Sequence, residues 1–166
     1  LRLYPNYADA HTNYGQLIAE QGDLDTGLRH FRRAATLNPA LPRAHLNLGV
    51  ALAKQGKLDE AVPALRQAVR LSPDSPEASY YLGSVYAAQN RYADAVESFR
   101  RTLRIEPNFA PAHQSLAQLL AMLGKTAEAS AHYREAIRIM KQQGTASGIR
   151  GGGCGTAAEE LPTRRL

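Results

Sequence analysis

The chain has 166 residues, 44% of them hydrophobic and 21% charged, which is an ordinary composition for a globular or repeat protein. The net charge of +5 is too small and too dispersed for a nucleic-acid binder, so nucleic acid is not an expected partner. The longest apolar runs are only a few residues, so no membrane insertion is expected. The single cysteine, Cys154, excludes an internal disulfide and a cysteine-based zinc site.

A period of 34 residues runs through the chain. The prolines that carry it are Pro5, Pro39, Pro73 and Pro107. Small or turn-forming residues recur at the same step: Gly22, Gly56, Asn90 and Gly124. A fixed period of this length indicates a solenoid of repeated helical units.

The period divides the chain from its first residues onward. Leu3 and Pro5 match Leu37 and Pro39 one unit later, so residues 1–7 are interpreted as the remnant of an upstream repeat. Four units then follow, and we place them at 8–41, 42–75, 76–109 and 110–143. After the fourth unit Lys141 stands where the period requires proline. Residues 144–166 are rich in glycine, and we expect them to form a disordered tail.

Each unit predicts two antiparallel helices. The first half places large and small residues at steps of three and four, which lie on one helix face; the first unit reads His11, Tyr14, Gly15 and Ile18. The second half has a small residue followed by a large one, as in Gly27 and Phe31. Glycine or asparagine tolerates the left-handed conformation where the first helix ends. Asp25 and Asp59 lie near the start of the second helix, where a carboxylate suits the exposed N–H groups.

This arrangement over residues 8–143 resembles the tetratricopeptide repeat family, whose pattern is large, large-small and large in one helix, then small, aromatic and small in the next. The resemblance implies an all-α fold. It implies a right-handed superhelical α-solenoid of four antiparallel helix-turn-helix hairpins. In this family the first helices line a concave groove that receives an extended peptide or a partner helix.

The resemblance also assigns candidate partner-binding residues in that groove. They are Asn13, Gln16, Arg43, Asn47, Val50, Lys54, Tyr80, Tyr81, Ser84, Gln114 and Gln118. Side-chain amides can donate to and accept from a peptide backbone, and tyrosines are enriched at binding hot spots. An alternative role for Val50 and Tyr80 is to support neighbouring helices.

Three functional hypotheses follow. The first is a protein–protein interaction scaffold that binds a peptide or partner segment in the groove. The second is an accessory, substrate-recruiting arm of a larger enzyme, such as an O-GlcNAc-transferase-like or membrane glycosyltransferase. The third is end-to-end self-association through Ile137, Ile139 and Met140 of the last unit. The compartment stays open between cytoplasm and periplasm.

No catalytic, cofactor or metal constellation is expected, and neither is a small-molecule substrate. His11, His45 and His113 occupy equivalent places in different hairpins, so neighbours should lie about 10 Å apart, the spacing of packed helices. Metal ligands must lie about 2 Å from one ion, so these residues, like His30 and His132, are interpreted as packing residues.

An arginine series recurs on the second helices, one residue per unit: Arg32, Arg66, Arg100 and Arg134. The series predicts a solvated helix face or, alternatively, a contact with an acidic partner or a membrane surface.

Overall fold

The computed structural model describes the backbone of residues 7–149 and the side chains of residues 7–143. The predicted upstream remnant, apart from Tyr7, lies outside the described residues, as do residues 150–166 of the predicted tail.

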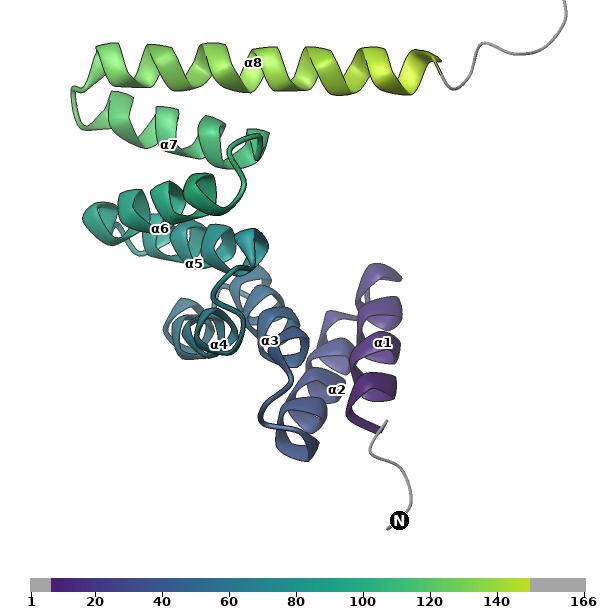
Figure 1. The fold of residues 1–166 in the computed structure, drawn as a ribbon. Helices are drawn as coiled ribbons and strands as arrows, with labels where there is room; N and C mark the ends of the chain where they lie inside the picture. The colour runs from purple at the N-terminus through teal and green to yellow at the C-terminus, as the bar shows by residue number, and fades with distance from the viewer. Residues whose placement is uncertain (1–6, 150–166) are drawn as a thin grey trace, which may run out of the picture.

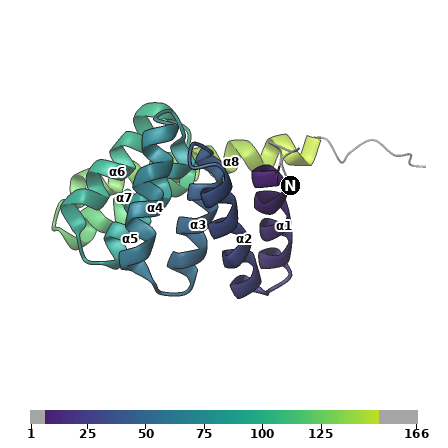
Figure 2. The ribbon, with the colours of Figure 1, turned by 90° about the horizontal axis from the view of Figure 1, so that it is seen from below.

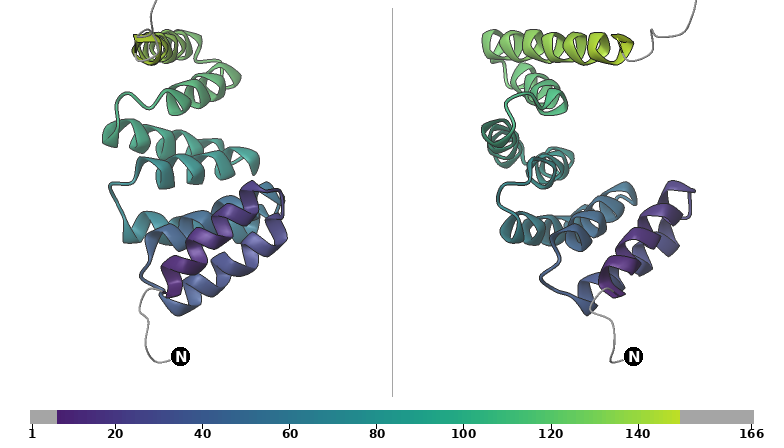
Figure 3. Two further views of the ribbon diagram at one scale, coloured as in Figure 1. Left: turned by 90° about the vertical axis from the view of Figure 1, so that its right-hand side faces the viewer. Right: turned by 45° about the vertical axis from the view of Figure 1, so that its right-hand side comes forward.

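The described part of the chain is built from eight helices (Figure 1). They are α1 (Tyr7–Glu20), α2 (Leu24–Leu37), α3 (Pro42–Lys54), α4 (Leu58–Leu71), α5 (Pro76–Ala88), α6 (Tyr92–Ile105), α7 (Ala110–Met122) and α8 (Thr126–Ile149). Consecutive helices pair as antiparallel hairpins, and the hairpins follow one another along a curved path from α1–α2 to α7–α8 (Figures 1 and 3). This is the predicted all-α, right-handed superhelical solenoid. No helix in the described part is both long and apolar enough to cross a bilayer.

The turns inside the hairpins have the predicted left-handed conformation. Gly22, Gly56 and Gly124 have φ angles of 98°, 76° and 77°, and Asn90 has 60°. A residue with a Cβ atom is strained there, and asparagine is the side chain that tolerates it best after glycine. The chain therefore reverses after α1, α3, α5 and α7 at the same point of each unit.

Asp25 and Asp59 lie in the first turns of α2 and α4, as the sequence interpretation placed them. The residue that caps α2 is Asp23, whose carboxylate accepts a hydrogen bond from the Thr26 N–H at 2.9 Å. Asp25 and Asp59 also bind the next unit. Their Oδ1 atoms accept hydrogen bonds from the Nε2 atoms of Gln55 at 2.5 Å and Gln89 at 2.7 Å. These two bonds are equivalent under the period and connect the first three hairpins.

Small residues allow the two helices of a hairpin to approach closely. A Cβ atom on Gly49 would lie 2.5 Å from Leu65 Cγ, and one on Gly83 would lie 2.9 Å from the ring of Phe99. Leu65 and Phe99 are themselves fully buried. At these two crossings a small residue of the first helix therefore lies against a large, buried residue of the second helix.

A continuous core runs through the solenoid from Leu28 in α2 to Ala129 in α8. The odd-numbered helices contact one another across units, whereas the even-numbered helices contact only their neighbours in the chain. The odd-numbered helices therefore lie closer together and line the inner side of the curve, and the even-numbered helices form the outer side. Figure 2 shows α1, α2 and α3 next to one another at one end of the array.

The last helix is longer than the sequence indicated. We placed the end of the fourth unit at residue 143, but α8 continues to Ile149. Proline ends a helix because it lacks the N–H and its ring clashes with the preceding turn, and the fourth unit has Lys141 at the proline position. Gly144 and Gly148 weaken a helix by only about 1 kcal/mol each relative to alanine, so they do not stop it.

Candidate functional site

The inner side of the solenoid contains a cavity of about 250 Å³ between α1, α3 and α5. It brings together five of the predicted partner-binding residues: Gln16, Asn47, Val50, Lys54 and Tyr81. Glu20 lines it too, and its Oε1 accepts a hydrogen bond from Gln16 Nε2 at 3.0 Å. The lining of this cavity therefore contains aliphatic and aromatic side chains, amides, one cation and one anion.

A second cavity, of about 440 Å³, lies further along the same side between α5 and α7. Two of the candidate partner-binding residues, Ser84 and Gln118, line it together with Met122, whose residue surface is 68% exposed. The apolar floor is the buried ring of Phe99 beside Leu119. We call the inner surface that contains both cavities the inner groove.

Four predicted residues line neither cavity. Arg43 donates to Asn13 Oδ1 at 2.6 Å and lies 3.6 Å from the Asp9 carboxylate, so these side chains connect α1 to α3. Tyr80 is half-buried, with its ring centroid 5.3 Å from that of Phe109. This contact fits the alternative supporting role for Tyr80. Gln114 is exposed on α7 outside both cavities.

The side-chain amide of Asn47, in the inner groove, has a buried donor without a hydrogen-bond partner among the described residues. This donor is the Nδ2 atom, and the residue lines the first cavity. A buried donor without a partner costs about 1–3 kcal/mol. A ligand carbonyl that accepted from this amide would relieve that cost.

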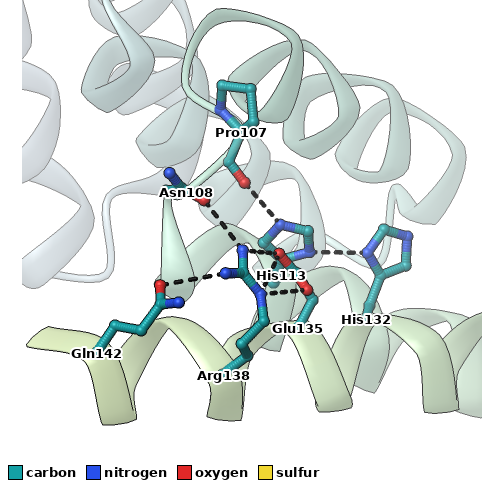
Figure 4. A network of polar contacts seen from close by, with 7 residues as sticks. All are labelled: Pro107, Asn108, His113, His132, Glu135, Arg138 and Gln142. Atoms are coloured by element: carbon teal, nitrogen blue, oxygen red, sulfur yellow. Dashed lines mark hydrogen bonds and ion pairs between the residues drawn. The ribbon is translucent and has the colours of Figure 1, made fainter.

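Four of the five histidines form two pairs that the sequence interpretation did not consider. His30 and His132 each pair with a histidine of their own hairpin: Nδ1 of His11 lies 2.7 Å from Nδ1 of His30, and Nδ1 of His113 lies 2.9 Å from Nδ1 of His132 (Figure 4). The pairs occupy equivalent positions in the first and fourth hairpins. The recurrence of a 19-residue spacing in units one and four was the signal in the sequence.

Burial lowers the pKa of two of these histidines. For His11 the desolvation is reinforced by the neighbouring His30 and Arg33. For His132 it is reinforced by His113 and Arg100, while Glu128 acts in the opposite direction. The lowered pKa favours the neutral imidazole of His11 and of His132, in which one ring nitrogen donates and the other accepts.

Two of the four arginines of the series form ion pairs within the described part of the chain. Arg32 binds Glu60 at 2.9 Å, and Arg100 lies 3.4 Å from Glu128, in each case one unit further on. Both pairs are exposed, and exposed pairs of this kind contribute little to stability.

A further arginine connects the last two helices. Arg138 donates to both carboxylate oxygens of Glu135, and also to Gln142 and to Asn108 in the turn before α7 (Figure 4). The hydrogen bonds from Arg138 lower the pKa of Glu135 and raise that of the guanidinium. No group of three His, Cys, Asp or Glu side chains converges as metal ligands in the part of the chain whose side chains are placed.

Comparison with known proteins identifies the repeat. Four overlapping segments match tetratricopeptide repeat families, at residues 1–42, 19–76, 46–111 and 86–146. The chain belongs to the tetratricopeptide repeat family, a class of protein-interaction scaffolds. No curated protein matches the chain.

Solved structures with the same fold include MamA proteins. A crystal structure of MamA is 23% identical, with a TM-score of 0.78 over 85% of this chain and 82% of that one. MamA from Desulfovibrio magneticus RS-1 is 22% identical, with a TM-score of 0.75 over 83% and 78%. At this level of identity the likeness concerns the fold.

Proposed function

We propose that the chain is a scaffold that holds an extended peptide or partner segment in the inner groove. The observation that carries the proposal is the unpartnered Nδ2 of Asn47 beside the first cavity. The terminal torsion of an asparagine is broad, so the amide can turn toward a backbone carbonyl at low cost. The bond gained would satisfy a donor that has no partner in the free chain.

The rest of the first cavity suits the same kind of ligand. Tyr81 is 38% exposed and offers a rigid aromatic surface. Lys54 and Glu20 provide one cation and one anion. They can bind ligand side chains of opposite charge, or a backbone carbonyl and a backbone N–H, respectively. The second cavity continues this surface with Ser84 and Gln118. A segment long enough to reach both cavities would contact apolar and polar side chains in each of them.

A displayed library of random twelve-residue peptides tests the proposal. We expect the selected peptides to bind the chain and to lose at least tenfold in affinity with the double change Asn47→Ala and Tyr81→Ala. Arg66→Ala is the control, since Arg66 is exposed on the outer helix α4 and lines neither cavity. If the selected peptides bind the double variant as tightly as the original chain, the inner groove is not the binding surface.

A second candidate function is end-to-end self-association. Leu17 on α1 is 51% exposed, whereas its equivalents Ala51, Val85 and Leu119 are at most 4% exposed beneath the preceding hairpin. At the other end of the described solenoid, Ile137 of α8 is 50% exposed. One copy stacked on the next would reproduce the contact between successive hairpins, a head-to-tail interface that can continue indefinitely.

The sequence interpretation assigned Ile139 to that contact, which was wrong because Ile139 is buried, with only 2% of its surface exposed. Met140 and Tyr133 are exposed on the same helix as Ile137. Sedimentation velocity at rising protein concentration tests the idea. We expect larger species that disappear in Leu17→Glu and in Ile137→Glu. A monomer at every concentration would contradict self-association and leave the groove proposal untouched.

A further inference from the structure

The first and last hairpins contain a histidine pair that the peptide groove does not use. Each pair joins the two helices of one hairpin, α1 to α2 through His11 and His30, and α7 to α8 through His113 and His132. The ring centroids are 4.9 Å and 5.1 Å apart. The same backbone positions thus present two imidazoles to each other twice in the chain.

We propose that these pairs are two-histidine binding sites for a divalent transition metal of the copper(II) or nickel(II) type. Imidazole nitrogen is a preferred ligand of these ions, and both favour tetragonal or square-planar coordination. Two ligands at adjacent corners of a square, each about 2.0–2.1 Å from the ion, lie about 2.9 Å apart. The Nδ1 atoms of His113 and His132 are 2.9 Å apart.

The same distance argues against tetrahedral zinc as the preferred ion. Tetrahedral ligands at that bond length are about 3.3–3.4 Å apart. Both pairs are closer than this, since the Nδ1 atoms of His11 and His30 are separated by only 2.7 Å. Zinc would have to push the rings apart further than a square-planar ion would.

The ring of His113 is oriented by a hydrogen bond of the kind that usually orients a metal-binding histidine. Its Nε2 donates to the carbonyl oxygen of Pro107 at 3.0 Å (Figure 4), which fixes the proton on Nε2 and leaves the Nδ1 lone pair free to accept. A backbone carbonyl in this role is the common outer-shell partner of metal-binding histidines. In the metal-free pair, His132 therefore donates its Nδ1 proton to His113.

Metal binding requires only one proton to move. As the ion binds, His132 changes from the Nδ1–H to the Nε2–H tautomer and turns about its broad χ2 torsion, so that both Nδ1 lone pairs face the metal. The two imidazoles stay neutral, and the step releases no net proton. His132 is only half-buried, which gives its ring room to turn.

The remaining coordination positions belong to water. No third His, Cys, Asp or Glu side chain joins either pair among the described side chains. The His11–His30 pair opens onto a cavity of about 240 Å³ that is also lined by Tyr7, Ala10 and Tyr14, which has room for water ligands. With two protein ligands, we expect weaker binding than at a structural four-ligand site. Each bound ion would join the two helices of one hairpin, α1 to α2 or α7 to α8.

The second and third hairpins have no histidine pair and can be compared with the first and fourth. The equivalent positions hold His45 with Ala64 in the second hairpin and Ser79 with Ser98 in the third. His45 Nε2 makes the equivalent bond to the carbonyl oxygen of Pro39, at 2.9 Å. The second hairpin therefore has one oriented histidine and lacks only its partner, so Ala64→His should create a third site.

Calorimetric titration of the full chain with NiCl₂ tests the proposal, on a Cys154→Ser background without an affinity tag so that no thiol or added histidine competes. We expect two Ni²⁺ ions per chain, one in either His30→Gln or His132→Gln, and none in the double variant. The control His45→Gln should keep two, and Ala64→His should bind three. Circular dichroism confirms that each variant is folded.

A spectroscopic readout separates the sites from adventitious binding. With CuCl₂, electron paramagnetic resonance should show nitrogen hyperfine coupling from two imidazoles per ion, and this coupling should be lost in the double variant. Unchanged stoichiometry in the folded double variant would overturn the proposal, and so would tighter binding of ZnCl₂ than of CuCl₂. Failure of these tests leaves the groove proposal intact, since no residue of the pairs lines either groove cavity.

Discussion

The crossing of α3 and α4 predicts that the substitution Gly49→Ala, which is neutral or destabilising alone, will partly compensate the destabilising substitution Leu65→Ala. Leu65 is fully buried and lies against Gly49, where an added Cβ would be 2.5 Å from Leu65 Cγ and 2.8 Å from Cδ2. Leu65→Ala removes the three carbons that occupy this space. Large-to-small changes of this kind cost about 2–5 kcal/mol, and we expect the upper half of that range because the neighbouring Gly49 has no side chain to move into the cavity.

Gly49→Ala has two opposing effects. The gain in helix propensity is about 1 kcal/mol, but the overlap with Leu65 costs about 1–3 kcal/mol, so the single change should be neutral or destabilising. In the double variant the overlap disappears, the propensity gain remains, and the new methyl group occupies part of the space left by Leu65. The double variant should therefore be more stable than Leu65→Ala by about 1–2 kcal/mol.

Urea unfolding followed by circular dichroism at 222 nm measures all four chains of this double-mutant cycle. Because a repeat array can unfold from its ends, the comparison should use a repeat-resolved fit or native-state hydrogen exchange of amides in α3 and α4. The close contact between Gly49 and Leu65 would be contradicted if the changes in unfolding free energy of the two single variants are simply additive. It would also be contradicted if Gly49→Ala stabilises the chain by its full propensity gain.

Three further predictions concern turns, caps and connections between units. Asn90→Ala should destabilise the chain by about 1–2 kcal/mol in chemical unfolding because φ is 60° there, while Asn90→Gly should cost less; equal effects would argue against the left-handed turn. The hydrogen bonds from Thr26 lower the folded pKa of Asp23, so its contribution to stability is present above the unfolded pKa of about 3.9 and is lost as the pH falls through the folded value. Asp23→Asn should flatten this part of the profile of unfolding midpoint against pH, and an unchanged profile would contradict the cap. Gln89→Leu removes the bond to Asp59 and should cost about 0.5–1.5 kcal/mol by thermal unfolding, an effect that Asp59→Ala should abolish in the double variant if the bond exists.

Much of the fold could be predicted from the sequence because the same turn and packing residues recur at the same positions of each 34-residue unit. Each turn has glycine or asparagine where the backbone needs a positive φ, and each helix crossing has a small residue opposite a large one, as with Gly83 and Phe99. Agreement between local signals in four successive units left few alternative folds. The end of α8 was missed because a missing proline is a weaker signal than a present one.

The candidate site was harder to predict because it depends on contacts between units. Gln16, Asn47 and Tyr81 could be placed on the inner surface from their position in the repeat, and the structure brings them to one cavity. Position alone did not show that Arg43 is held by Asn13 and Asp9, since that contact depends on the rotation between neighbouring hairpins. The histidine pairs were missed because each was compared with its equivalents in other units, not with its neighbour in the same hairpin.

Site-specific photocrosslinking tests the groove proposal most directly. Benzoylphenylalanine replaces Lys54, which lines the first cavity, or Arg66, which is exposed on the outer helix α4. A library-selected peptide should crosslink to the chain from position 54 and not from position 66, and an excess of unlabelled peptide should suppress the reaction. Equal crosslinking from both positions, or crosslinking from position 66 alone, would contradict binding in the inner groove.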